Sequence, residues 1–301
     1  MSPILLPNRQ IISVSGVDAK SFLQGLISND IEQVSGDKSI YAAFLSAQGK
    51  FLHDLFISSR DGEYLIDCES ARAADLVKRL TMYKLRAQVD IKNRADDFAI
   101  MAVMDGKSDL PQHNGETVSY ENGILYRDPR LADIGWRMIL PKNKLPTSSD
   151  FYEYDYVRAK LGLPDGSRDM EIDRAIILEN GFQELNAIDW QKGCYVGQEL
   201  TARTKYRGLV RKRLLPCEVT TGVNVPEFGT KIELRLPDGM KIDAGETRSA
   251  IQGKDGDPSL VLALLRLEHV MQPHEFYTGN IVLRPYIPHW MRLPEQESEE
   301  M

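Results

Sequence analysis

The pattern of apolar and polar positions divides the chain into short strands and a few helices. In the first half of the chain, runs rich in β-branched, aromatic and aliphatic residues end at Gly, Asn, Asp or Ser, which is typical of strands joined by turns. The expected strands cover residues 10–15, 39–45, 51–58, 62–68, 87–92, 98–104, 116–120, 123–128 and 135–141.

Three segments carry apolar residues at helical spacing instead. Residues 15–30 form the first, and residues 71–83 form the second, which Ser70 is placed to cap. Residues 150–164 form the third, with a glycine and then a proline at its end. Strands paired by hairpins, with helices on one side, predict an α+β body.

The pattern changes from about residue 209, where strand-like runs follow one another with no long helical segment between them. Turn residues separate the runs, and the "PDG" of residues 237–239 is typical of a hairpin turn. This part of the chain therefore predicts an antiparallel β-barrel. The expected strands lie in residues 209–219, 230–250, 259–268 and 280–286.

Composition narrows the class of protein. A chain of 301 residues is long enough for about two or three domains. The net charge of −7 does not favour a dedicated nucleic-acid binder, which is usually basic. Three cysteines without close spacing predict a reducing compartment. No signal peptide, transit peptide or membrane span is expected, so a soluble cytoplasmic protein is predicted.

Cys194 is the first candidate for chemistry. It lies in "WQKGCYVGQELTAR" between Gly193 and Gly197, next to Lys192 and just before a predicted short helix. A positive field at such a position favours the thiolate, which is the reactive form. The alternative is that a small, buried cysteine fills a turn. No histidine lies nearby in the sequence to act as a base, and one cysteine alone cannot build a zinc site.

A run of basic residues follows Cys194 and is unusual in an acidic chain. On a strand, Arg211 and Arg213 are expected to share one face, with Lys212 on the other. The run indicates a site for carboxylates, phosphates or RNA, and the alternative is a solvated strand face. The run comprises Arg203, Lys205, Arg207, Arg211, Lys212 and Arg213.

The motif "KGCYVGQELTART", followed by "RGLVRKRL", resembles the K-G-C-Y-x-G-Q-E signature of the YgfZ-like folate-binding proteins. These are maturation factors for iron–sulfur proteins and a branch of the aminomethyltransferase family, the T-protein of the glycine cleavage system. Two earlier blocks, "GVDAKSFLQGLISNDI" and "YAAFLSAQGKFLHDL", are similar to the start of that family. "IDRAIILENGF" resembles its P-x-E-x-G segment, with Glu179 at the glutamate and Ile177 where proline often stands.

The resemblance implies a T-protein-like cloverleaf of three domains around a central folate site. Two are α+β domains, and the third is the C-terminal antiparallel β-barrel. The first domain is discontinuous in this family. The expected limits are 1–48 with 142–208 for the folate-binding domain, 49–141 for the inserted domain, 209–290 for the barrel, and 291–301 for a disordered tail.

The resemblance also implies roles for single residues around tetrahydrofolate or a one-carbon derivative of it. Arg203, Lys205 or Arg207 is expected to hold the carboxylates of the glutamate tail. Glu179 or Glu199 is expected to accept hydrogen bonds from the pterin. Tyr195 or Trp190 would cover an aromatic face, and Gln198 belongs to the same cofactor-binding set. Cys194 and Lys192 are the expected catalytic pair.

Three functions remain open at this point. The first is a folate-dependent accessory factor that acts with iron–sulfur client or assembly proteins. The second is a tetrahydrofolate-dependent aminomethyltransferase or other one-carbon transferase, for which Asp75 is loosely in register with the T-protein's aspartate. The third is an RNA-binding module that uses the basic run, which the acidic composition does not favour. Whether the protein is an enzyme, and its oligomeric state, also stay open.

Overall fold

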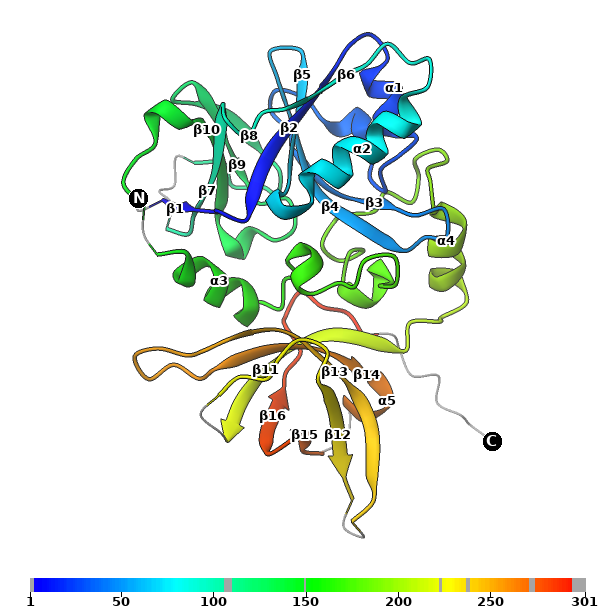
Figure 1. Ribbon diagram of the computed structural model, residues 1–301, viewed down its shortest axis with the longest axis vertical. Coiled ribbons are helices and arrows are strands. Elements are labelled where there is room, and N and C mark those ends of the chain that lie inside the picture. Colours follow the sequence, from blue (N-terminus) through cyan, green and yellow to red (C-terminus); the bar gives the residue numbers. More distant parts are fainter. Residues whose placement is uncertain are drawn as a thin grey trace.

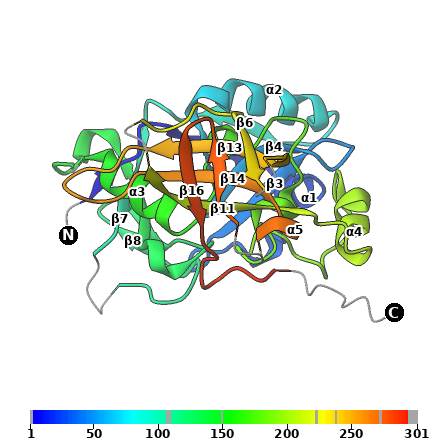
Figure 2. The same ribbon diagram turned by 90° about the horizontal axis from the view of Figure 1, so that it is seen from below.

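The computed structural model places an α+β body against a C-terminal barrel (Figure 1). Helix α3 (Phe151–Lys160) lies between the two and contacts strands of both. Seen from below, the barrel covers the middle of the body, and helix α4 (Gln198–Tyr206) lies at one side (Figure 2). The structure describes residues 3–105, 110–148, 150–221, 224–236, 239–270 and 274–293.

The first sheet of the body has the strand order β3-β4-β5-β2-β6, and each neighbouring pair is antiparallel. Apolar side chains on each face of this sheet belong to a buried core, and β3 is buried along its whole length. Helices α1 (Ala19–Gln24) and α2 (Ala73–Lys84) pack their apolar residues on one face. The strands are β2 (Arg9–Ser15), β3 (Ile40–Leu45), β4 (Phe51–Arg60), β5 (Glu63–Glu69) and β6 (Asp90–Asn93).

The second sheet has the order β1-β7-β10-β9-β8 and is also antiparallel. Its central strands β7 and β10 are almost fully buried because the two sheets share one apolar core. The strands are β1 (Ile4–Leu5), β7 (Phe98–Val103), β8 (Thr117–Tyr120), β9 (Gly123–Arg127) and β10 (Trp136–Pro141).

The C-terminal strands form a closed antiparallel barrel in the order β11-β14-β13-β12-β15-β16. This confirms the predicted barrel and, with the two sheets, the predicted fold class. Part of the expected "PDG" turn, residues 237–238, lies outside the described residues. The elements are β11 (Lys212–Thr221), β12 (Lys231–Arg235), β13 (Lys241–Ile251), β14 (Leu260–Arg266), α5 (Leu267–Val270), β15 (Phe276–Thr278) and β16 (Ile281–Pro285).

Short 3₁₀ segments join several of these elements, and one predicted helix is shorter than expected. The helix expected over residues 15–30 is confined to α1, and its last residue, Gln24, begins a turn over residues 24–29. Asp18 stands at the start of α1, but its side chain accepts from the backbone N–H of Gln88 instead of capping the helix. The 3₁₀ segments are Ile31–Gln33, Ser70–Arg72, Ala132–Ile134, Lys142–Lys144, Gly166–Arg168 and Ile177–Asn180.

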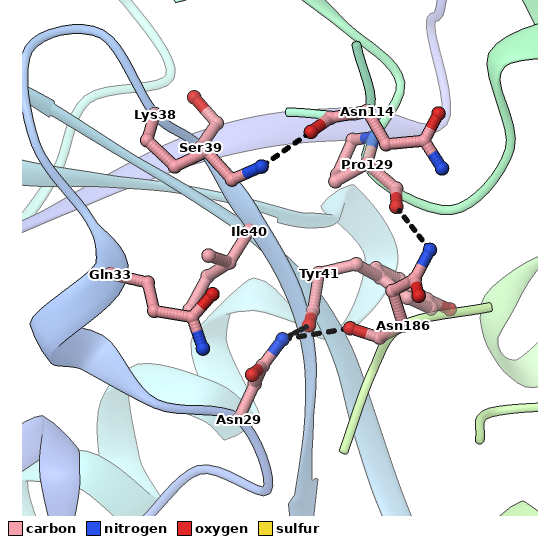
Figure 3. Close-up of a pocket in the computed structure, with 9 residues that line it drawn as sticks. All are labelled: Asn29, Gln33, Lys38, Ser39, Ile40, Tyr41, Asn114, Pro129 and Asn186. Carbon is pink, nitrogen blue, oxygen red and sulfur yellow. Dashed lines mark hydrogen bonds between the residues drawn. The ribbon is translucent and has the colours of Figure 1, made fainter. Parts of the chain in front are cut away.

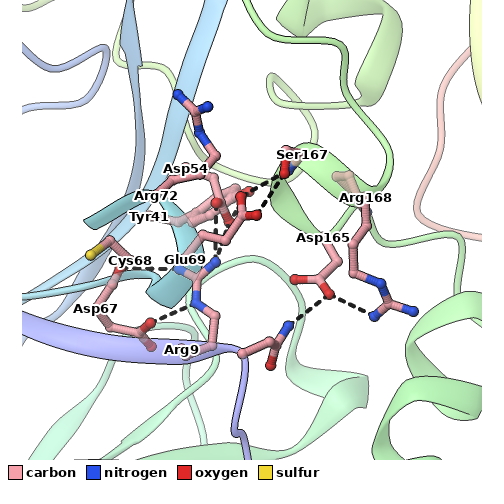
Figure 4. A network of polar contacts seen from close by, with 12 residues as sticks. Arg9, Tyr41, Asp54, Asp67, Cys68, Glu69, Arg72, Asp165, Ser167 and Arg168 are labelled. Carbon is pink, nitrogen blue, oxygen red and sulfur yellow. Dashed lines mark hydrogen bonds and ion pairs between the residues drawn. The ribbon is translucent and has the colours of Figure 1, made fainter. Parts of the chain in front are cut away.

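The two sheets are joined by buried ion pairs. Asp67 on β5 accepts from Arg9 Nε at 2.7 Å through one oxygen and from Arg137 on β10 through the other. Arg9 also pairs with Asp54 at 3.1 Å, and the Arg137 guanidinium lies 3.9 Å from the ring centroid of Phe56. Figure 4 shows Arg9 between the carboxylates of Asp54 and Asp67. Each buried charge therefore has a partner, as a dry interior requires.

Another buried arginine, Arg158, joins the body to the barrel. Arg158 on α3 donates to Asp155, to Asp169 at 2.9 Å and to the hydroxyl of Ser249 on β13. The backbone N–H of Ser249 returns a hydrogen bond to Asp169 at 3.0 Å. These contacts fix the orientation of the barrel, because moving it would leave a buried charge without its partners.

The expected domain limits stay a prediction. Strands β3 and β4 lie on either side of the expected limit at residues 48 and 49, and they pair as one hairpin. Residues 291–293 of the expected tail are described, and residues 294–301 lie outside the described residues.

Replacing Asp67 with asparagine tests the contact between the sheets. We expect Asp67→Asn to lower the free energy of unfolding by about 3–5 kcal/mol, because two buried guanidinium groups lose their shared carboxylate. Denaturant unfolding followed by circular dichroism measures the change. Asp61→Asn is the matched control, since Asp61 is an exposed turn residue whose positive φ asparagine also adopts. Equal stabilities of the two variants would contradict the role of Asp67.

Candidate functional site

Cys194 is the exposed cysteine of this chain, and it lies in a loop over residues 189–197 that leads into α4. Cys68 and Cys217 are buried, the first in the first sheet and the second in the barrel. Burial raises the pKa of the Cys68 thiol to about 12 and raises that of Cys217 further. The sequence's reactive-thiol candidate is therefore the one that solvent can reach.

The loop over residues 189–197 rests on the turn over residues 24–29. The backbone N–H of Asp189 donates to Ser28 O at 3.1 Å, and that of Val196 donates to Gly25 O at 3.1 Å. Between these two points, Lys192 Nζ donates to three backbone carbonyls of the turn. The segment "LQGLISND" and the cysteine motif are thus brought together although they are far apart in the sequence.

The segment "YAAFLSAQGKFLHDL", which forms the β3–β4 hairpin, meets the same loop at Gly49 and Gly197. Gly197 has φ +84°, and a Cβ there would lie 2.6 Å from Ser46 O. A Cβ on Gly49 would lie 2.9 Å from Gly197 O. Both positions therefore require glycine, because a side chain would collide with backbone. Gly193 differs, since no atom lies within 4 Å of a Cβ placed there.

The basic run does not form one cluster of free cations. Arg203 on the exposed face of α4 pairs with Glu199 at 2.7 Å, and Arg207 is exposed at the end of that helix. Arg213 is buried, donating to Leu178 O at 3.1 Å and to Glu184 at 2.7 Å. The expectation that Arg211 and Arg213 share a strand face is wrong, because β11 begins at Lys212 and Arg211 is exposed before it.

A groove runs beside the loop. Its middle part is a cavity of about 410 Å³ lined by residues that include Trp190, Gln191 and Lys205. A cavity of about 300 Å³ adjoins it and shares Asn29, Gln33 and Asn186 with it. A third cavity of about 230 Å³ continues toward the barrel and shares Gln183 and Lys205 with the middle one.

The cavity of about 300 Å³ is lined mainly by amide and backbone groups (Figure 3). Asn29 Nδ2 donates to the carbonyls of Tyr41 and Asn186, each at 2.8 Å. The Asn186 amide donates in turn to Pro129 O at 3.2 Å, and Lys38 reaches Asn114 O. These contacts hold the wall of the groove in one shape.

The charges along the groove are mostly positive. Asp189 accepts from Gln33 at 2.9 Å and from two backbone N–H groups of its own loop, and Glu184 is paired with Arg213. Lys205 Nζ lies 3.8 Å from the ring centroid of Trp190, a cation–π contact. The charged lining residues are Lys38, Glu184, Asp189, Lys205, Arg213 and Arg292.

Glu179 lies where the body meets the barrel, in the turn Ile177–Asn180 directly after the groove residue Leu178. It is half-buried, and burial raises the pKa of its carboxyl against the opposing effect of Lys212 and Lys50. A half-buried carboxyl among cations is suited to bind a polar ring that carries N–H groups.

The remaining predicted residues are placed as follows. Gln198 opens α4 and is half-buried, and Glu199 faces solvent beside it. Tyr195 is buried, and burial raises the pKa of its hydroxyl to about 12. Lys192 Nζ lies 5.2 Å from the Tyr195 ring centroid. The structure brings Trp190 and Lys205 to the groove, whereas Cys194, Glu199, Arg203 and Arg207 are not among its lining residues.

The groove residues Asn29 and Asn186 were not anticipated. Asn29 lies in the quoted block "GLISNDI", so its place in a motif was the signal that could have found it. The catalytic and cofactor-binding assignments themselves stay predictions. The described residues hold no group of three or more His, Cys, Asp or Glu side chains placed to bind a metal ion. Helices in the described part of the chain all fall short of the length and apolar character of a membrane span.

Asp75, the residue considered for aminomethyl transfer, lies on α2 and is held by three side chains. It accepts from His53 Nε2 at 3.0 Å, from Arg72 at 2.9 Å and from Arg79 at 2.8 Å. It is not among the residues that line the groove. His53 is buried, and burial, with Arg72 nearby, lowers its pKa to about 4.

The lowered pKa of His53 predicts a loss of stability in mild acid. Below about pH 6.5 the unfolded chain binds a proton at this histidine, whereas the folded chain does so only near pH 4. Between these values the native protein should lose up to about 3 kcal/mol of stability relative to His53→Gln, whose amide keeps the N–H to Asp75. Urea unfolding of both proteins from pH 7 to pH 4 measures this. Parallel curves would contradict a buried, neutral His53.

Comparisons with known proteins agree with this architecture. The family model described as the GCVT N-terminal domain matches residues 8–109, and that of the CAF17 C-terminal beta-barrel domain matches residues 211–293. The structure is similar to that of glycine cleavage system aminomethyltransferase T from Bartonella henselae, with a TM-score of 0.72 and 12% identity. That match covers 93% of this chain and 83% of the other, so the T-protein-like fold is confirmed.

Similar sequences are named as iron–sulfur cluster assembly factors. The mitochondrial IBA57 homolog of Pyricularia oryzae is 35% identical over 87% of this chain and 71% of its own length. Mitochondrial IBA57 of Mus musculus is 30% identical and that of Homo sapiens 28%, each over 95% of this chain and 84% of the relative.

These names correct one expectation and narrow another. The predicted cytoplasmic location is wrong, because the relatives are mitochondrial proteins. Unpaired cysteines indicate a reducing environment without saying which compartment provides it. The narrower likeness to YgfZ-like proteins stays a prediction. The chain belongs to the IBA57 family of iron–sulfur cluster assembly factors, a branch of the aminomethyltransferase fold family.

Proposed function

We propose that the protein is a mitochondrial, tetrahydrofolate-binding accessory factor for the assembly or repair of iron–sulfur proteins, with Cys194 as its reactive thiol. Family membership supports the role in iron–sulfur cluster assembly. The observation that carries the finer proposal is the meeting of three motif segments at one loop, beside a positively charged groove. Partners would be client or assembly proteins that receive or supply clusters.

The groove fits the chemistry of a folate. Its middle part offers the Trp190 indole and the Lys205 ammonium, which suit an aryl ring and the carboxylates of a glutamate tail. Glu179, next to groove residue Leu178, suits the amine and ring N–H groups of a pterin. Trp190 and Gln191 line the groove, and Cys194 follows them in the same loop. A bound tetrahydrofolate would supply one-carbon or reducing chemistry at this place.

Two alternatives fit the contacts less well. An aminomethyltransferase needs an aspartate free to promote transfer, whereas Asp75 is held by three cationic or imidazole groups. An RNA-binding module needs a continuous basic surface, whereas Arg203 is paired with an acid and Arg213 is buried. These observations favour the accessory role.

Calorimetry with tetrahydrofolate tests the groove. We expect Lys205→Met to weaken binding about tenfold, because a charge-assisted contact to the tail is lost. Arg203→Met is the matched control on the same helix, and we expect it to change the affinity less than twofold, since Arg203 faces solvent and pairs with Glu199. A larger effect of Arg203→Met than of Lys205→Met would indicate that the glutamate tail binds at the outer face of α4. No binding by the unmodified protein would overturn the folate proposal.

Complementation of cells that lack the protein tests the function itself. We expect Cys194→Ser to lose most of the activity of mitochondrial iron–sulfur enzymes and Asp75→Asn to restore it. Buried Cys217→Ser is the control for loss of a thiol as such, with its protein level measured alongside. The transferase alternative makes the opposite prediction, namely turnover of an aminomethyl-loaded lipoyl carrier that Asp75→Asn abolishes and Cys194→Ser leaves intact.

A further inference from the structure

The ammonium group of Lys192 is enclosed by backbone oxygens. Its Nζ lies 2.8 Å from Gln24 O, 2.8 Å from Ile27 O and 2.7 Å from Asn29 O. A lysine ammonium has three N–H donors and no acceptor, so these contacts use all of its hydrogen-bonding capacity. None is left to exchange a proton with a ligand or with the Cys194 thiol.

The three carbonyls belong to the end of α1 and the turn that follows it. Gln24 is the last residue of α1, where backbone carbonyls lack partners within the helix. Burial lowers the pKa of Lys192 to about 8, and Asp30 and Asp189 act in the opposite direction. The position therefore costs some solvation of the charge and returns hydrogen bonds to groups that need them.

Lys192 stands midway between the two backbone contacts that attach the loop. On one side Asp189 N–H donates to Ser28 O, and on the other Val196 N–H donates to Gly25 O. Asp189 Oδ1 also accepts from the backbone N–H of Gln191 and of Lys192, so the start of the loop is held from within. Cys194 lies between these fixed points and faces solvent.

We propose that Lys192 is a positioning residue, whose ammonium clamps the loop over residues 189–197 onto the turn over residues 24–29 and so holds Cys194 beside the groove. This rests on the proposed function, in which Cys194 is the reactive thiol, and it replaces the catalytic role expected of Lys192. Asn29 connects the clamp to the groove, because its backbone carbonyl accepts a hydrogen bond from Lys192 Nζ while its side chain lines the groove. One turn thus supports both the thiol and the groove wall.

Hydrogen exchange of the intact protein tests the clamp. In Lys192→Met we expect the amides of Asp189 and Val196 to exchange at least tenfold faster, while amides of β2 and β14 are unchanged. Lys78→Met, at an exposed position on α2, is the matched control and should leave all of these amides protected. Should Lys192→Met not fold, Lys192→Arg keeps the donors, and a loop as protected as in the unmodified protein is then expected. Unchanged protection in Lys192→Met, or a fully opened loop in Lys192→Arg, would overturn the clamp.

A double-mutant comparison tests the link to the thiol. In the complementation assay, Lys192→Met and Cys194→Ser should each lower iron–sulfur enzyme activity, and the double variant should be no worse than Cys194→Ser alone. Losses that multiply would show that Lys192 acts elsewhere and would overturn the inference. Full activity of Cys194→Ser would instead refute the reactive thiol of the proposed function and the positioning role with it, and hydrogen exchange would still judge the clamp separately.

Discussion

One buried carboxylate, Asp67, sits between two arginines that come from different sheets, and the body depends on this contact. A guanidinium group taken out of water must find matched acceptors, because an unpaired buried charge costs several kcal/mol. Arg9 and Arg137 share Asp67, so a shift of either sheet would leave a buried charge without its partner. Arg158 applies the same constraint between α3 and the barrel through Asp169. Buried ion pairs therefore fix the relative position of two sheets that otherwise meet through a shared apolar core.

The frame allows three distant segments to meet at close range. The turn over residues 24–29, the β3–β4 turn and the loop over residues 189–197 come from three places in the chain. The loop is hydrogen-bonded to the first turn, and its backbone approaches the β3–β4 turn closely at Gly49 and Gly197. Such approach tolerates no side chain, so the site depends on where the sheets hold these turns. The groove beside them carries an excess of cations on a protein whose net charge is −7.

The chemistry available at this surface is limited, and the limits are informative. Cys194 belongs to a loop whose first residues line an aromatic and cationic groove. The nearest lysine in the sequence, Lys192, donates all three of its ammonium hydrogens to backbone carbonyls. Asp75, on helix α2, accepts hydrogen bonds from His53, Arg72 and Arg79, all at its Oδ2 atom. The thiol is exposed and lies outside the lining of the groove, so other molecules can reach it directly.

Most strands and the barrel could be predicted from the sequence, because alternation and turn residues are local properties. The role of the cysteine motif stays a prediction. The sequence also predicted that a short helix follows Cys194, and α4 begins directly after Gly197. Only the tertiary structure shows that Arg213 forms a buried ion pair with Glu184, that the Lys192 ammonium donates to backbone carbonyls, and that Asn29 lines the groove. These three features depend on contacts between residues far apart in the chain. A local sequence pattern does not indicate which distant residue a charged group or an amide will contact.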